Sequence, residues 1–258
     1  TLDSGTYKDR IELPRERFFQ EIKIMDGMPK TSAPSPAEFE PAFQAAIDKG
    51  DSVICFTLSS DASASFQNAG IAGKKVGGKI SIVDTRTAGF GVGINVLKAA
   101  RMAKEGVDHD EIVRLSNDRV SRVRTLVLLD TMEYLQRGGR ISAATAKMGS
   151  LLRIKPIIQF MRNGKIGLLH RARGLNRGME WLADYCISVK KDFSKSLVMI
   201  AYAENENIAL QLLDKLKQRS KIGEVIIGGI GCVVGSHVGS NGVGVFFEED
   251  PALTKNDF

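Results

Sequence analysis

The sequence predicts an α/β fold built from two domains. Between residues 51 and 130, apolar runs of strand length alternate with helix-forming segments, which is the pattern of a parallel sheet flanked by helices. After Pro156 the pattern changes, because an Asn163-Gly164 turn between two short apolar runs indicates a β-hairpin. We therefore expect a Rossmann-like parallel sheet in residues 1–153, and a mixed or antiparallel sheet covered by helices in residues 154–258.

The composition is that of a globular protein with an ordinary core. Of the 258 residues, 43% are hydrophobic and 26% are charged. No apolar run approaches the roughly 20 residues that span a bilayer, and the first residues lack the features of a signal peptide. The cysteines Cys55, Cys186 and Cys232 lie far apart in apolar segments, which predicts free thiols in a reducing cytoplasm. The chain starts at Thr1 without a methionine, and we expect the opening strand of the first domain to be missing from it.

The net charge of +6 allows an acidic partner or substrate. Lysine and arginine are spread along the chain, with mild concentrations in residues 137–155 and 162–177. Aromatic residues make up only 7%, and no basic stretch interleaves with them, so nucleic-acid binding is disfavoured. The basic residues instead favour docking of an acidic protein or an acidic head group.

The first elements are a short helix, a proline-rich loop and a second helix. Leu13 to Ile22 has proline near its start and apolar residues on one side, which is typical of a helix. The next segment, Met28 to Pro36, is rich in proline and hydroxyl residues and predicts an extended loop that could present Thr31 and Ser32 to a ligand. Ser35 is expected to cap a helix that begins at Pro36.

The parallel sheet is expected to follow. Ser52 to Leu58 is a continuous apolar run that predicts a buried parallel strand. A hydroxyl-rich loop, residues 59–65, then opens a helix, and this is where α/β proteins place ligands. Free N–H groups at the helix start favour an anion, which makes Ser63 a candidate ligand-binding residue. Residues 79–87 repeat the strand and loop, and residues 123–129 predict a third strand of this sheet.

Residues 130–156 connect the two predicted domains. A short helix is expected to stop at Gly138-Gly139, where a sharp exit costs little. Arg140 follows the turn directly, so we expect its side chain to be presented rather than packed. Ala143 to Leu152 predicts a small-residue helix, which Pro156 would end.

The last third of the chain holds further strands and a glycine-rich segment. Six glycines lie in the sixteen residues from Gly229 to Gly244, which predicts a loop with tight turns or a close approach of the backbone. His237 lies within it and is the best histidine candidate, since His109 is expected in a surface loop and His170 in a strand.

The motifs exclude several classes of site. No P-loop is present, and the glycine clusters lack dinucleotide spacing. A metal site is not expected either, because only one histidine is convincing and no Cys/His spacing matches. Thr31, Ser63, Arg140 and His237 form a set of hydrogen-bond donors without an acid–base pair, which indicates a carboxylate-binding site. An enzyme of the hydrolase or transferase class using Ser63 and His237 remains the alternative.

Six motifs together resemble the DegV family of bacterial fatty-acid-binding proteins. They are PKTSAPSP (29–36), LSSxxS (58–63), DTMEYLQRGGRI (130–141), GSLLRIKPII (149–158), RGLNRG (173–178) and IGCVVGSHVG (230–239). The resemblance covers nearly the whole chain, and its motifs are specific in combination.

The resemblance implies a lipid carrier rather than an enzyme. One long-chain fatty acid would lie in a buried tunnel, with its carboxylate bound by Thr31, Ser63 and His237, and the second domain would close over the lipid site. Arg140 and Arg173 would belong to a basic patch that meets an ATP-binding fatty acid kinase, and catalysis would reside on that partner. No other cofactor, no nucleic acid and no stable membrane insertion is implied.

Overall fold

The structure, a computed structural model, describes residues 1–142 and 154–250. It confirms an α/β fold with one small parallel sheet and one larger mixed sheet. The chain divides into two compact units. Within the described residues, the first unit comprises residues 1–31, 124–159 and 166–250, and the second comprises residues 32–123 and 160–165.

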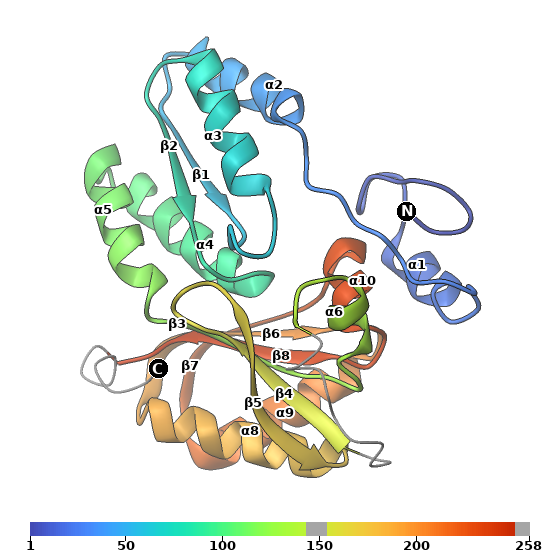
Figure 1. The fold of residues 1–258 in the computed structure, drawn as a ribbon. Coiled ribbons are helices and arrows are strands. Elements are labelled where there is room, and N and C mark those ends of the chain that lie inside the picture. The colour runs from blue at the N-terminus through green and yellow to red at the C-terminus, as the bar shows by residue number, and fades with distance from the viewer. Residues whose placement is uncertain (143–153, 251–258) are drawn as a thin grey trace. The chain divides into compact units, whose positions relative to one another are not determined.

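The second unit is built on two parallel strands. β1 (Val53–Thr57) pairs with β2 (Ile80–Asp84) in the register Val53 to Ile80. Helices α2 (Pro36–Ile47) and α3 (Ser65–Val76) lie on one face of the pair, and α4 (Phe90–Lys104) and α5 (His109–Val120) lie on the other (Figure 1). This is the predicted arrangement of alternating strands and helices. As expected, Ser35 caps α2, and its backbone N–H donates to the Glu38 carboxylate in a capping box.

The first unit contains a six-stranded sheet with the order β5-β4-β3-β8-β6-β7. β6 and β7 run parallel, whereas β3 with β4 and β6 with β8 are antiparallel pairs. Helices α8 and α9 cover one face of this sheet (Figure 1). The bounds are β3 (Val123–Leu128), β4 (Ile154–Phe160), β5 (Ile166–Arg173), α8 (Leu175–Val189), β6 (Phe193–Tyr202), α9 (Glu206–Arg219), β7 (Ile222–Gly229) and β8 (Val243–Glu248).

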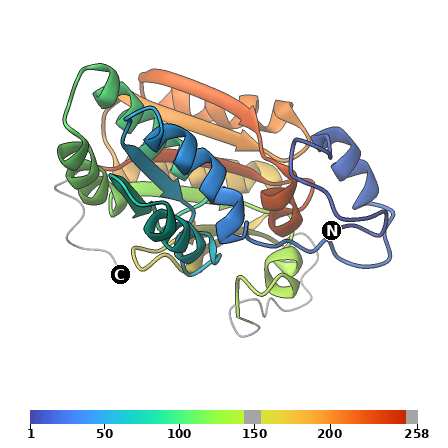
Figure 2. The ribbon, with the colours of Figure 1, turned by 90° about the horizontal axis from the view of Figure 1, so that it is seen from above.

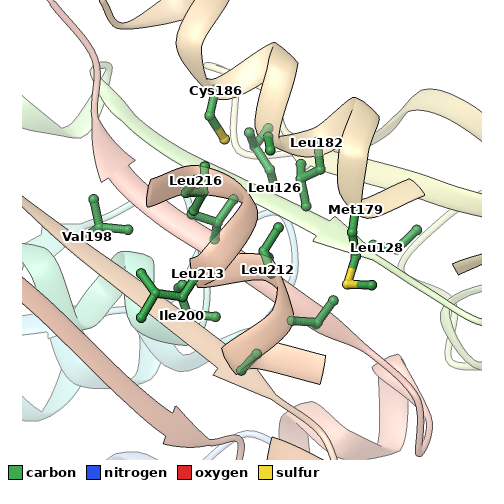
Figure 3. Packing of buried hydrophobic residues seen from close by; sticks show 14 of the residues in the cluster. Leu126, Leu128, Met179, Leu182, Cys186, Val198, Ile200, Leu212, Leu213 and Leu216 are labelled. Atoms are coloured by element: carbon green, nitrogen blue, oxygen red, sulfur yellow. The ribbon is translucent and has the colours of Figure 1, made fainter. Parts of the chain in front are cut away.

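The core of the first unit lies between this sheet and its two helices. Side chains of β3, β6, α8 and α9 point toward one another in Figure 3. Leu126, Leu182, Ile200 and Leu212 are fully buried there. Burial of each such side chain contributes about 1.5–3 kcal/mol, so this cluster fixes the sheet on which the other elements of the unit are built.

Three short helices complete the first unit: α1 (Arg15–Glu21), α6 (Glu133–Arg137) and α10 (Cys232–Val238). The segment formed by residues 1–31, which contains α1, lies beside α10 in both ribbon views (Figures 1 and 2). The predicted helix at Leu13–Ile22 is confirmed. Phe18 and Phe19 from α1 are almost completely buried.

The third strand was assigned to the wrong sheet by the sequence pattern. Residues 123–128 form a strand as expected, but β3 pairs antiparallel with β4 in the six-stranded sheet, with Leu126 opposite Gln159. An apolar run of strand length identifies a buried strand without identifying its partner. As a consequence, the two units divide the chain differently from the expected ranges 1–153 and 154–258.

Other predictions have mixed outcomes. The hairpin is confirmed, since Gly164 turns with φ 84° between β4 and β5. The helix predicted at Ala143–Leu152 lies outside the described residues. Across residues 1–142 and 154–250, no helix has the length and apolar character needed to cross a bilayer.

Candidate functional site

His237 lies on a helix and not in a loop as its glycine-rich surroundings predicted. α10 forms because its glycines allow close packing: a Cβ at Gly235 would lie 2.7 Å from Cε1 of Phe18 and 3.1 Å from Cζ of Phe19. Glycine is therefore required at this position by the approach of α1, and not by a turn. His237 is in the last turn of the helix.

The other end of α10 is held by Asp9 from the N-terminal segment. The backbone N–H groups of Cys232 and Val233 donate to the two carboxylate oxygens of Asp9, at 2.8 and 3.1 Å. A carboxylate at this position satisfies two N–H groups that lack partners within the helix. Asp9 thereby fixes the start of the helix whose end carries His237.

Thr31 and His237 are brought into direct contact although 206 residues separate them. The distance from Thr31 Oγ1 to His237 Nε2 is 2.9 Å. Both residues belong to the first unit, and both side chains are half-buried. The structure therefore places together two of the three residues expected to bind a carboxylate.

The opposite edge of the His237 ring faces Gly138. A Cβ at Gly138 would lie 2.5 Å from Nδ1 and 2.8 Å from Cε1 of His237, so only glycine allows the ring to lie there. Nδ1 is buried, with no hydrogen-bond partner within the described part of the chain. Burial, and then the positive charge of Arg140, lower the pKa of His237 to about 4. The imidazole is consequently neutral at pH 7.

Arg140 is more enclosed than the sequence predicted. Its side chain is half-buried, and its Nη1 donates to the carbonyl oxygen of Gly138 at 2.6 Å. Arg140 is therefore only partly presented, and its guanidinium contacts the turn that precedes it. Arg173, the last residue of β5, is exposed.

Ser63 lies in the second unit, at the predicted strand-to-helix loop. Its hydroxyl is 2.9 Å from the hydroxyl of Ser65 and accepts a hydrogen bond from the Ser65 backbone N–H. Two neighbouring hydroxyls have other partners, since Ser59 donates to the carbonyl of Gly164 and Ser60 donates to Asp84. The hydroxyls of Ser63 and Ser65 therefore contact each other at the start of α3.

The two remaining histidines lie elsewhere. His109 is buried, with its ring nitrogens 3.0 and 2.8 Å from the hydroxyls of Ser52 and Ser81, so its prediction as a surface loop residue is wrong. His170 is in strand β5 as expected and stacks on Trp181. No group of three potential metal ligands is found among residues 1–142 and 154–250.

Sequence reasoning missed two residues that shape this site. Gly138 was interpreted only as a helix stop, and nothing in the local pattern indicates its contact with His237. Asp9 lies 223 residues from Cys232, so its role as a cap could not be read from spacing.

The comparisons with known proteins agree with this fold. The model of the DegV family, described as a family of uncharacterised proteins, matches residues 1–250. A DegV domain-containing protein from Caldanaerobacter subterraneus subsp. tengcongensis is 33% identical over 250 residues, covering 96% of this chain and 88% of its own.

Solved structures of the same fold include proteins that bind fatty acids. The structure of a fatty-acid-binding DegV family protein from Thermus thermophilus matches with a TM-score of 0.89 at 26% identity, over 96% of this chain and 89% of the other. The fatty acid kinase B3 protein of Streptococcus pneumoniae, loaded with linoleic acid, shares the fold with a TM-score of 0.86 at 20% identity, over 96% and 88%. By sequence and by structure, the chain belongs to the DegV family.

Proposed function

We propose that this protein binds one long-chain fatty acid and holds its carboxylate with Thr31, Ser63 and His237. The observation that carries the proposal is the hydrogen-bonded pair of Thr31 and His237, in a chain similar to a fatty-acid-binding protein of Thermus thermophilus. The pair offers a hydroxyl and a neutral imidazole, and Ser63 offers a second hydroxyl at a helix start. Such donors suit a carboxylate, and they include no strong nucleophile or acid–base pair.

The energetics favour a carrier with a polar head-group site. Transfer of a methylene group from water contributes about 0.8 kcal/mol, so a sixteen-carbon chain gains roughly 12 kcal/mol when it is fully buried. An unpaired carboxylate in the same environment would cancel much of that gain. Several hydrogen-bond donors are therefore needed where the carboxylate is bound.

Loss of either a hydroxyl or the imidazole is expected to weaken binding. For Ser63→Ala and His237→Ala we expect palmitate affinity to fall about 10-fold to 100-fold each. Each change removes a hydrogen bond to the carboxylate, or to a residue that itself binds the carboxylate. Titration of delipidated protein with palmitate measures this. Ser35→Ala, a change at an exposed hydroxyl that caps α2, is the matched control and is expected to retain wild-type affinity. Two variants with unchanged affinity would remove these residues from the head-group site.

We further propose that the protein presents the bound fatty acid to an ATP-dependent fatty acid kinase. The support is the family resemblance together with the exposed Arg173 and the half-buried Arg140. An arginine surface can bind acidic groups of a partner through paired hydrogen bonds. On this proposal, ATP binding and catalysis belong to the partner.

Arg173→Glu is expected to weaken kinase docking and to spare lipid binding. Arg173 is exposed, so charge reversal should remain local, whereas Arg140→Glu would also disturb Gly138 and His237. Surface charge reversal at an interface should lower the association rate about 10-fold or more at low salt. Surface plasmon resonance with the kinase measures the rate. Lys217→Glu, an exposed change on α9 with the same net charge, is the control, and equal effects of the two variants would exclude a specific patch.

A further inference from the structure

Ser59 is fully buried in the loop that carries Ser63. Its backbone N–H donates to the carbonyl of Thr87 at 2.7 Å. Its hydroxyl donates to the carbonyl of Gly164 at 2.7 Å and accepts from the backbone N–H of Asp61 at 3.3 Å. A buried hydroxyl needs such partners, because leaving it unsatisfied costs free energy. The position of Ser59 is therefore set by these contacts.

The carbonyl of Ser59 fixes the backbone of Ser63. It accepts from the backbone N–H groups of Ala62 and Ser63, at 2.9 and 3.1 Å, and so closes a single helical turn. Ser63 is the last residue of this turn, and its hydroxyl accepts from the Ser65 N–H at 3.2 Å. The position of the Ser63 hydroxyl consequently depends on the position of Ser59.

Gly164 approaches Ser59 from a turn that lies 105 residues further along the chain. A Cβ at Gly164 would lie 2.5 Å from Oγ of Ser59, and the glycine has φ 84°. Both the close contact and the backbone conformation require glycine at this position. The turn between β4 and β5, residues 160–165, belongs to the second unit together with Ser59 and Ser63.

Arg86 forms a second contact with the same turn. Its guanidinium donates to the carbonyl of Arg162 at 3.1 Å, and its backbone N–H donates to the Asp84 carboxylate at 3.0 Å. The Asp84 carboxylate also accepts from the hydroxyl and the backbone N–H of Ser60, at 2.6 and 3.2 Å. Arg86 has φ 51°, which is unfavourable for a residue with a side chain, so these hydrogen bonds hold it in place. The turn is thus attached to the loops that follow both β1 and β2.

We propose that the turn between β4 and β5 positions Ser63 for its ligand: Gly164 fixes Ser59, and Ser59 fixes the helical turn that ends at Ser63. Gly164 and Ser59 are both buried and act through Ser63, so they are positioning residues. A hydrogen-bonding group contributes most to binding when its position is fixed before the ligand arrives. The role toward a carboxylate rests on the proposed function, whereas the fixing of the loop does not.

Hydrogen exchange tests the loop without any ligand. Exchange of the Ala62 and Ser63 N–H groups is measured by NMR on delipidated protein. We expect Ser59→Ala to accelerate both about 10-fold or more. Ser81→Ala is the matched control, because the Ser81 hydroxyl also has a partner in this unit, His109 Nε2 at 2.8 Å, but lies outside the loop. Wild-type rates in Ser59→Ala, or equal acceleration in both variants, overturn the proposal.

Palmitate and methyl palmitate separate positioning of Ser63 from a general loss of binding. The two ligands share the acyl chain, but the ester lacks the charged carboxylate. We expect Ser59→Ala to weaken palmitate binding about 10-fold and methyl palmitate binding less than about 2-fold. An equal loss for both ligands overturns the proposal. If wild-type protein does not bind palmitate, the proposed function is refuted, and the exchange rates still decide whether Ser59 fixes the loop.

Gly164→Ala tests the contact from the turn. Gly106→Ala is its matched control, because Gly106 has φ 81° in the same unit and a Cβ there would meet no atom within 4 Å. We expect Gly164→Ala to accelerate exchange of the Ser63 N–H about 10-fold or more, and Gly106→Ala to leave the wild-type rate. In Ser59→Ala the added Cβ no longer meets Oγ, so the double variant is expected to exchange no faster than the faster single one. Accelerations that multiply, or equal rates in the two glycine variants, overturn the proposal.

Discussion

Replacing Glu249 by glutamine is expected to lower the free energy of unfolding by about 3–5 kcal/mol. Arg124 Nε of β3 donates to Glu249 Oε2, just after β8, at 2.5 Å, and the side chains are only 6% and 0% exposed. Glutamine keeps the shape but removes the negative charge, so the guanidinium remains buried without its counter-charge. Urea unfolding followed by the fluorescence of Trp181, the single tryptophan, reports on the unit that contains this pair.

An exposed ion pair provides the matched control for this change. Arg137 pairs with Glu133 on α6, in the same unit as Trp181, at 2.7 Å, with side chains 59% and 49% exposed. Glu133→Gln is expected to change the free energy of unfolding by less than about 1 kcal/mol, because solvent screens the pair. If the two glutamine variants have similar stability, burial does not govern the Arg124–Glu249 interaction. Replacing both buried residues by apolar ones, as in Arg124→Met with Glu249→Leu, is expected to recover most of the loss.

Gly138→Ala is expected to reduce palmitate affinity at least about 10-fold. The backbone of Gly138 has φ −72°, which alanine adopts without strain. The added Cβ, however, would lie 2.5 Å from Nδ1 of His237 and 2.9 Å from the carbonyl oxygen of Tyr134. Because the backbone oxygen cannot move easily, the imidazole must shift away from Thr31. Isothermal titration with palmitate measures the consequence.

The neighbouring glycine separates this steric effect from a general loss of stability. Gly139 has φ 73°, and a Cβ added there would meet no atom within 4 Å, so Gly139→Ala strains the backbone without touching His237. We expect Gly139→Ala to lower stability by about 1 kcal/mol and to retain palmitate affinity. Wild-type affinity in Gly138→Ala, or an equal loss in both variants, would contradict the assigned contact.

Local patterns in the sequence predicted the elements whose causes are local. The helix cap at Ser35, the Asn163-Gly164 turn and the apolar strands all appear where expected. The pairing partner of each strand was harder to predict, because an apolar run indicates that a strand is buried but not which strand lies beside it. The strand at residues 123–128 was therefore expected in the parallel sheet, whereas it lies in the six-stranded sheet. The two units consequently divide the chain at other residues than expected.

The site was predictable only in part for the same reason. The sequence identifies Thr31 and His237 as candidates, and the structure shows a direct contact between their side chains across 206 residues. The helix that contains His237 was not predicted, because glycines usually disfavour a helix. Here Gly235 allows Phe18 to pack closely against the helix. Gly138 and Asp9 act through contacts with distant residues, and no spacing rule could identify them. Ser63 as a carboxylate ligand stays a prediction.

The central claim is that the protein carries one fatty acid, and extraction of the purified protein tests it most directly. Denatured protein is extracted with organic solvent, and its fatty acids are quantified by mass spectrometry, before and after incubation with palmitate. We expect close to one acyl chain per protein molecule. Protein that carries no fatty acid even after incubation with palmitate would contradict the account and favour the alternative of a small-molecule enzyme.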